Sequence, residues 1–172
     1  MRVIAGHYRG TRLHTPSGVA IRPTSDRLRE SIFNIIGPRI RGKRILDLFA
    51  GTGAVGLEAL SRGARSVVFV ERHRSAARLI EKNCAAFGLD VGRAELLVRH
   101  ADQAIRHRAS RGDSFDIAWA DPPFEIWYEG LEVVMKLFET GILGAGCLAC
   151  LECPSRADVV DSLPSDLEII RD

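Results

Sequence analysis

The sequence predicts an α/β fold, a doubly wound and mostly parallel sheet. Three observations predict it. Short apolar runs alternate with stretches of helical spacing, which is typical of parallel strands joined by helices. A glycine-rich turn directly follows the first apolar run, as in nucleotide-binding folds of this class. The chain has 172 residues with 46% hydrophobic content, enough for one packed domain with helices on both faces of a sheet.

The first strand is predicted at Arg44–Leu48, and it runs into the turn GTGAVG at residues 51–56 and a helical pattern. Glycines let the backbone approach a ligand, and a helix N-terminus adds exposed amides. Glu71 follows a second strand at Ser66–Val70, 20 residues after the first glycine. At that spacing an acidic side chain meets ribose hydroxyls. The pattern predicts an adenosine ligand, and it fits a dinucleotide dehydrogenase as well as an adenosyl-methionine enzyme.

Asp102 follows a third apolar run, residues 94–99. At the end of a strand its carboxylate could accept a hydrogen bond from an adenine amino group. It also stands just before a helical stretch, residues 103–108, where aspartate is a common N-cap. The sequence leaves both roles open.

The motif DPPF, residues 121–124, follows a fourth strand at Phe115–Ala120. An exocyclic amine on a nucleobase is a poor nucleophile because its lone pair is delocalised into the ring. Asp121 and the backbone carbonyl of Pro122 could each accept a hydrogen bond from such an amine, and two prolines stiffen the turn. Phe124 could stack on the base. The motif predicts a methyltransferase, although Asp-Pro-Pro can also simply end a strand.

Charge is distributed unevenly along the chain. The net charge is +2, yet residues 1–44 hold ten Lys or Arg against two acidic residues. Interleaved glycines and a tyrosine suit a small hairpin or arm, residues 1–21, whose arginines contact phosphates and unpaired bases. A solvated charged surface is the alternative. The candidate RNA-binding residues are Arg2, Arg9, Arg12, Arg22 and Arg27.

Cys147, Cys150 and Cys153 have the spacing of part of an iron-sulfur motif. Residues 147–152 are predicted to form a fifth strand, where alternation would turn Cys150 away from Cys147 and Cys153. The histidines form no pair at ligand spacing, so we expect no metal. No apolar run reaches membrane-spanning length and the N-terminus shows no pattern of signal-peptide type, so we expect a cytoplasmic protein.

Taken together, the segments LDLFAGTG (46–53), VE (70–71), AD (101–102) and DPPF resemble the motif series of class I S-adenosylmethionine-dependent amino-methyltransferases. Upstream, RVIAG (2–6), YRG (8–10) and RPTSDR (22–27) resemble the RsmD family in particular. The resemblance implies methylation of guanine N2 in 16S ribosomal RNA. It also implies a monomer that acts on an assembled or assembling small ribosomal subunit.

The resemblance also implies roles for individual residues. Residues 22–172 would form the methyltransferase domain, and we expect the chain to end before that fold's final antiparallel strand. Thr24 would begin a helix whose amides hold the cofactor carboxylate, with apolar positions at Leu28, Ile32, Ile35 and Ile36. Asp47 would position the glycine turn. The cofactor-binding set is Thr24, Asp47, Phe49, Gly51, Gly53, Glu71, Ala101 and Asp102, and the catalytic set is Asp121, Pro122 and Phe124.

Three other functions remain open at this point. An adenine-N6 DNA methyltransferase could use the same Asp-Pro-Pro-aromatic motif. A nucleotide-sensing RNA-binding module could keep the sheet without catalysis. A dehydrogenase could use the same glycine turn and acidic residue.

Overall fold

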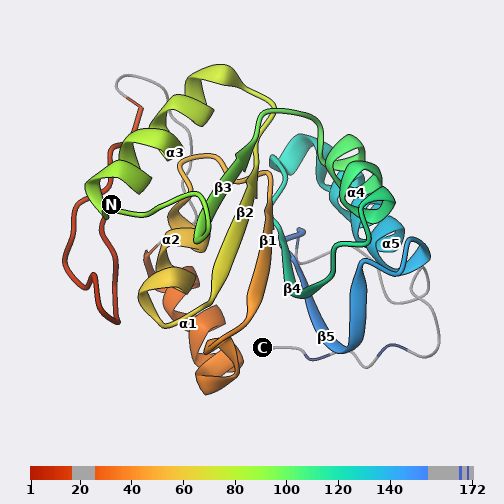
Figure 1. Ribbon diagram of the computed structural model, residues 1–172, viewed down its shortest axis with the longest axis horizontal. Helices are drawn as coiled ribbons and strands as arrows, with labels where there is room; N and C mark the ends of the chain where they lie inside the picture. The colour runs from red at the N-terminus through yellow and green to blue at the C-terminus, as the bar shows by residue number, and fades with distance from the viewer. Residues whose placement is uncertain (17–25, 155–166, 168–169, 171–172) are drawn as a thin grey trace.

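A computed structural model describes residues 1–16, 26–154, 167 and 170 (Figure 1). Its five strands form one sheet in the order β3-β2-β1-β4-β5, and every neighbouring pair is parallel. The order reverses direction at β1, between β2 and β4. This doubly wound parallel sheet confirms the predicted fold class.

Three of the strands have the predicted bounds: β1 (Arg44–Leu48), β2 (Ser66–Val70) and β4 (Phe115–Ala120). Strand β3 (Ala94–Leu97) ends two residues earlier than predicted. Strand β5 (Leu143–Leu151) begins four residues before the predicted segment 147–152. Its first residues, Leu143-Gly144-Ala145-Gly146, contain two glycines, which weaken a strand signal in the sequence.

Helices cover both faces of the sheet (Figure 1). One face packs against α1 (Asp26–Ile36), α2 (Ala54–Ser61), α3 (Arg74–Ala86) and the N-terminal segment. The other face packs against α4 (Ala101–Ser110) and α5 (Trp127–Glu139). Two short 3-10 helices, η1 (Gly37–Ile40) and η2 (Phe124–Ile126), complete the described elements. Apolar residues therefore alternate between two separate cores along each strand.

Residues 1–14 form a small hairpin, as the sequence predicts for the basic segment. Arg2 and Arg12 form an antiparallel bridge, and the Val3 N–H donates to the Thr11 carbonyl at 3.0 Å. Val3 and Leu13 are buried in the core beside α1 and α2. The hairpin therefore packs on the body of the fold, while its division from residues 22–172 as a separate domain stays a prediction.

The predicted apolar face of α1 is partly wrong. The helix buries Arg29, Phe33 and Ile36, whereas Ile35 is 41% exposed. The Arg29 guanidinium donates to the Arg2 carbonyl at 2.8 Å and pairs with Asp26 at 2.9 Å. A charged residue thus occupies the buried face because it binds the hairpin, a role that hydrophobic spacing cannot reveal.

The expected absence of a final antiparallel strand stays a prediction, because most of the chain after residue 154 lies outside the described residues. Within the ranges that the structure describes, no helix has the length and apolar character needed to cross a membrane.

Candidate active site

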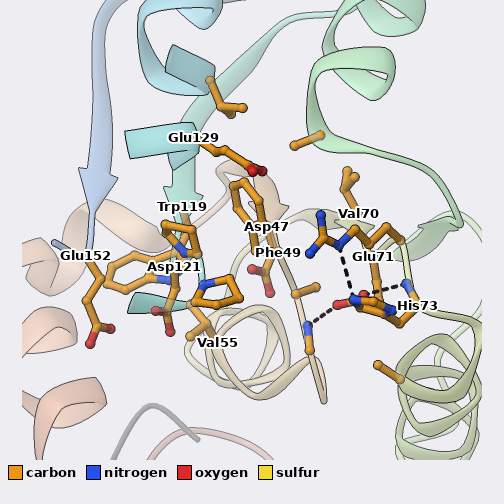
Figure 2. Close-up of a pocket in the computed structure, with 18 of the residues that line it drawn as sticks. Asp47, Phe49, Val55, Val70, Glu71, His73, Trp119, Asp121, Glu129 and Glu152 are labelled. Carbon is orange, nitrogen blue, oxygen red and sulfur yellow. Dashed lines mark hydrogen bonds between the residues drawn. The ribbon is translucent and has the colours of Figure 1, made fainter. Parts of the chain in front are cut away.

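A cavity of about 1060 Å³ opens where β1, β2 and β4 end (Figure 2). This edge also contains the switch in strand order, where open α/β sheets bind ligands. Nine of the eleven predicted catalytic and cofactor-binding residues line it: Asp47, Phe49, Gly51, Glu71, Ala101, Asp102, Asp121, Pro122 and Phe124. Gly53 stands behind the lining as the N-cap of α2, and Thr24 lies outside the described residues.

The turn after β1 has an unusual backbone. Phe49, Gly51 and Gly53 have positive φ angles of 58°, 56° and 77°. A phenylalanine in this region is uncommon, and such strain clusters at ligand sites. Backbone hydrogen bonds stabilise the turn: the Ala50 N–H donates to the Val70 carbonyl at 2.9 Å, and the Gly53 N–H donates to the Ala50 carbonyl at 2.7 Å.

Gly56, the third glycine of the motif, serves packing. A Cβ atom on Gly56 would lie 2.3 Å from the Phe69 ring on β2. Only glycine therefore lets α2 approach the sheet closely enough to place its N-terminus beside the cavity.

Glu71 links the turn to the end of β2. Its carboxylate accepts hydrogen bonds from the Gly51 N–H at 2.9 Å and the His73 N–H at 2.7 Å (Figure 2). Each carboxylate oxygen has a further lone pair for a ligand hydroxyl. Glu71 therefore orders the glycine turn and faces the same cavity.

Asp47 is buried at the base of the cavity and accepts a hydrogen bond from the Gly56 N–H at 3.0 Å. Burial raises its pKa from 3.8 to about 8, and the Gly56 bond lowers it only in part. The negative charges of Asp121 and Glu71 raise the pKa further. Asp47 positions the helix N-terminus, and the negative charges of two other cavity-lining residues act on it.

The predicted N-cap alternative for Asp102 is wrong. Helix α4 begins at Ala101 with His100 as its N-cap. Asp102 lies in the first turn, lines the cavity and forms an ion pair with Arg106 at 2.6 Å. The adenine-binding role of Asp102 stays a prediction.

The DPPF segment lines the cavity directly after β4. Phe124 lines the cavity and is 49% exposed. Pro122 packs against α5 at Gly130, where a Cβ atom would lie 2.6 Å from the Pro122 Cγ. Gly130 was not among the predicted site residues. A lone glycine within a helical pattern was its only signal.

Two residues of the cavity lining, Trp119 and Glu152, were also absent from the predicted site. Glu152 follows β5, so the rule that ligands bind at the carboxyl ends of strands could have identified it. Trp119 lies on β4, the strand next to β5. Its side chain is buried in the core and lines the cavity from that side.

The described basic candidates are all exposed. Arg2, Arg9 and Arg27 line a second hollow of about 330 Å³ together with Asp26 and Glu30. Arg12 lies on the same hairpin, bridged to Arg2, and Arg22 lies outside the described residues. Their contact with RNA stays a prediction.

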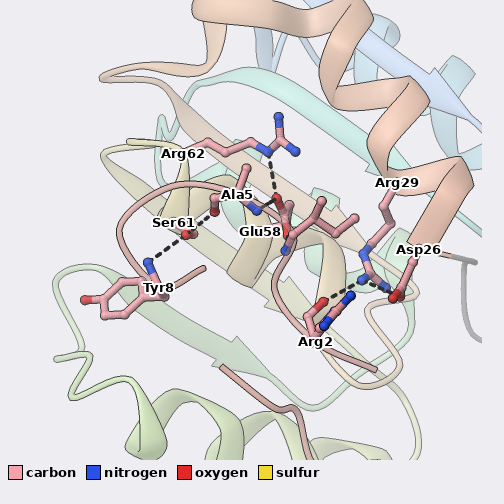
Figure 3. A network of polar contacts seen from close by, with 9 residues as sticks. Arg2, Ala5, Tyr8, Asp26, Arg29, Glu58, Ser61 and Arg62 are labelled. Atoms are coloured by element: carbon pink, nitrogen blue, oxygen red, sulfur yellow. Dashed lines mark hydrogen bonds and ion pairs between the residues drawn. The ribbon is translucent and has the colours of Figure 1, made fainter. Parts of the chain in front are cut away.

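Three buried polar residues from α2 and α3 fix the hairpin to the body, and none was predicted. Figure 3 shows two of them, Glu58 and Ser61. Glu58 accepts from the Ile4 N–H at 2.7 Å and the Ala5 N–H at 3.0 Å. Ser61 Oγ accepts from the Tyr8 N–H and donates to the Ala5 carbonyl.

The third residue, Asn83, connects the hairpin to the glycine turn. Its side chain accepts from the His14 N–H at 2.7 Å and donates to the Thr52 carbonyl at 2.9 Å. The basic hairpin and the cavity are thus held in one fixed arrangement.

The cysteines are free thiols, and Cys150 and Cys147 pack against opposite faces of the sheet. This confirms the predicted alternation. No group of three or more metal-ligating side chains occurs among the described residues.

The family model described as Conserved hypothetical protein 95 matches residues 1–172. Ribosomal RNA small subunit methyltransferase D of Escherichia coli (strain K12) is 36% identical over 167 residues, 96% of this chain and 78% of that protein. The protein of the same name from Haemophilus influenzae is 36% identical over 124 residues, 72% of this chain and 64% of that one. A solved structure of a hypothetical protein from Thermus thermophilus has a TM-score of 0.80 at 31% identity, covering 99% of this chain and 92% of that one.

Proposed function

The chain belongs to the Conserved hypothetical protein 95 family, and we propose that it transfers a methyl group from S-adenosylmethionine to the exocyclic N2 of a guanine in 16S ribosomal RNA. The names of its relatives support an rRNA methyltransferase of the small subunit, in line with the RsmD motifs. The observation that carries the proposal is the position of the DPPF segment and the strained glycine turn in one cavity.

The charge of the cavity favours S-adenosylmethionine over a dinucleotide. Asp121 and Glu71 are close enough to Asp47 for their charges to raise its pKa. A sulfonium cation would be stabilised among these carboxyl groups, whereas the pyrophosphate of NAD would be repelled. After transfer the product sulfur is neutral, which would weaken its binding and favour release.

In this proposal the turn at Phe49, Gly51 and Gly53 holds the methionine end, and Thr24 contributes to holding its carboxylate. Glu71 accepts from the ribose hydroxyls. Ala101 and Asp102 contact the adenine. Asp47 holds the turn and the start of α2 through Gly56 and needs no direct contact with the cofactor.

The target guanine leaves its stack and lies with one face against Phe124. The amine donates hydrogen bonds to Asp121 and the Pro122 carbonyl, which bring the N2 lone pair into line with the methyl group. N2 forms a bond to the methyl carbon while the carbon–sulfur bond breaks and its electron pair stays on sulfur. The extra N2 proton then leaves to solvent or through Asp121. Orientation and hydrogen bonding to the increasingly positive nitrogen supply most of the catalysis.

The exposed arginines of the hairpin, with Arg22 and Arg27, would bind phosphates and fix the register of the RNA while the cavity selects the base. We propose a cytoplasmic monomer that acts on an assembled or assembling small subunit, with residues 1–21 as the RNA-contacting part and 22–172 as the methyltransferase domain.

A transfer assay with methyl-labelled cofactor tests this function against its rivals. The substrates are assembled small subunits, naked 16S RNA and duplex DNA. We expect label in ribosomal RNA at guanine N2. Label in DNA alone would support an adenine methyltransferase, and no label with any substrate would support a non-catalytic module.

The variant Asp121→Ala should lower transfer at least about 1000-fold while the dissociation constant for S-adenosylhomocysteine changes less than about threefold in calorimetry. Asp90→Ala is a matched control, because Asp90 is exposed outside the cavity. Loss of cofactor binding in Asp121→Ala would show that Asp121 belongs to the cofactor site instead.

A further inference from the structure

Glu152 is placed beside Asp121 by the register of the sheet. Ala120 and Leu151 are paired residues on β4 and β5, so Asp121 and Glu152 occupy the next position on each strand. The Glu152 N–H donates to the Ala120 carbonyl at 2.9 Å, which continues the ladder to this point. Neighbouring strands lie about 4.8 Å apart. Two carboxylates therefore stand side by side at the rim of the cavity, as Figure 2 shows.

Trp119 provides a second, independent sign of a ligand in this corner. Its side chain is 4% exposed and lines the same cavity, directly behind Asp121 on β4. Its Nε1 donor is buried and has no acceptor among the residues that the structure describes. An unmatched buried donor costs stability, so this corner is suited to a ligand that carries an acceptor.

The three groups are of the donor and acceptor types that the hydrogen-bonding edge of guanine requires. That edge offers two donors side by side, the N2 amine and the N1–H, and then the O6 acceptor. Asp121 is the acceptor for N2, Glu152 is a second acceptor one strand away, and Trp119 is a donor. Adenine differs at the critical atom, because its N1 is an acceptor and would face a carboxylate with no proton between them.

We infer that Glu152 is a specificity-determining residue, which accepts a hydrogen bond from the N1–H of the target guanine. This inference rests on the proposed function, since it needs guanine N2 in the pocket at Asp121. The DPPF segment suits any planar exocyclic amine. A carboxylate at position 152 favours guanine, which has an N1–H to donate, and disfavours a purine whose N1 has no hydrogen. Glu152, after β5, thus selects the base, and Asp121, after β4, activates the amine.

The test compares guanine with 2-aminopurine, which keeps the N2 amine but has an unprotonated N1 and no O6. The methylated guanine is first located with the labelled cofactor. The 16S RNA is then ligated with 2-aminopurine at that nucleotide and reassembled into small subunits. Transfer rates give kcat/KM for the two bases with the full-length enzyme.

Glu152→Gln is the informative variant, because an amide can accept from guanine N1–H or donate to the N1 of 2-aminopurine. Wild-type enzyme should prefer guanine by about tenfold or more. Glu152→Gln should lower that preference at least tenfold, through slower transfer to guanine and faster transfer to 2-aminopurine. Loss of the Trp119 partner at O6 affects both enzymes alike, so the change in preference reports on Glu152.

Two controls separate this role from a structural one. Glu152→Gln should bind S-adenosylhomocysteine within about twofold of wild type. Glu132→Gln, at a carboxylate elsewhere on the cavity lining, should keep the wild-type preference. If Glu152→Gln also keeps the wild-type preference, the inference is overturned and the proposed function stands. If wild-type enzyme methylates no ribosomal substrate, the proposed function fails and the inference fails with it.

Discussion

At the scale of single residues, Asp47 shows how burial changes the chemistry of a motif position. Its carboxyl group accepts a hydrogen bond from one backbone amide, and the residue is almost fully buried at the base of the cavity. With a pKa of about 8 in the folded state against 3.8 ordinarily, it keeps its proton at neutral pH. The folded state then binds a proton that the unfolded state has released, so folding stability falls as pH rises from about 4 to about 8.

We predict that Asp47→Asn removes this fall. An asparagine carbonyl can accept from the Gly56 N–H and carries no charge to desolvate. The free energy of unfolding of the variant, minus that of the wild type, should increase by about 2–5 kcal/mol as the pH is raised from 4 to 8. Urea unfolding at several pH values measures the difference.

Asp116→Asn is the matched control, because Asp116 has a pKa lowered by the Arg44 N–H and by Lys43. Its stabilising effect is present at neutral pH and is lost as pH falls, so the variant should lose stability at pH 7 and match the wild type in acid. A constant difference between Asp47→Asn and wild type across this range would contradict the assignment.

At the scale of secondary-structure elements, the contact between α5 and the DPPF turn fixes the position of Pro122. Pro122 fits against α5 only because position 130 has no side chain. The proline ring cannot rotate out of the way, and the Leu151 Cδ1 on β5 would lie 2.9 Å from a Cβ atom added at position 130. The turn is therefore positioned by a helix that follows it in sequence.

We predict that Gly130→Ala lowers methyl transfer while cofactor binding is kept. The added methyl group must move Pro122 or the helix, and a displacement of about 1 Å is enough to lower transfer by about tenfold to 100-fold. Binding of S-adenosylhomocysteine should change less than about threefold, because the glycine turn does not contact position 130. Single-turnover kinetics and calorimetry measure the two effects. Gly144→Ala, at a position with open space on β5, should leave transfer unchanged; equal transfer by both variants would refute the positioning role of Gly130.

At the scale of the whole molecule, the basic hairpin and the cavity form one rigid unit. Glu58 and Ser61 bind the hairpin backbone from α2, and Asn83 joins its end to the Thr52 carbonyl of the glycine turn. The hairpin arginines consequently have a fixed position relative to Asp121. An RNA bound by the hairpin would reach the cavity in one register.

We predict that the double variant Arg9→Glu/Arg12→Glu weakens RNA binding and its dependence on salt. Both side chains are exposed, so the fold should be unaffected. Loss of two phosphate contacts should reduce the slope of log affinity against log salt by about 2, so the defect is larger at low salt. Filter binding of small subunits over a salt series measures this slope.

Arg39→Glu/Arg111→Glu makes the same charge change at exposed positions outside the hairpin. It should affect binding less than the hairpin variant does. A defect of the hairpin variant that is equal at all salt concentrations would indicate misfolding instead of lost phosphate contacts.

The local features of this protein could be predicted because they depend on neighbouring residues. Arg44–Leu48 is a short apolar run next to glycines, so β1 and its turn are visible in the sequence. The prediction for the apolar face of α1 was partly wrong because it, too, depended only on neighbouring residues. Hydrophobic spacing selects Ile35 for the core, but Arg29 is buried there because the hairpin backbone, 27 residues away, provides its acceptor.

The parallel α/β fold, the glycine turn with Glu71 and the DPPF segment could be predicted from the amino-acid order alone, since strand patterns, turn chemistry and short motifs are encoded within a few residues. Which side chains share the cavity with them became visible only in the folded chain. Glu152 reaches Asp121 through strand register, Gly130 reaches Pro122 through helix packing, and Asn83 reaches both Thr52 and His14 across the body. Such contacts depend on how a parallel sheet gathers its strand ends at one edge, and no local pattern in the chain records that arrangement.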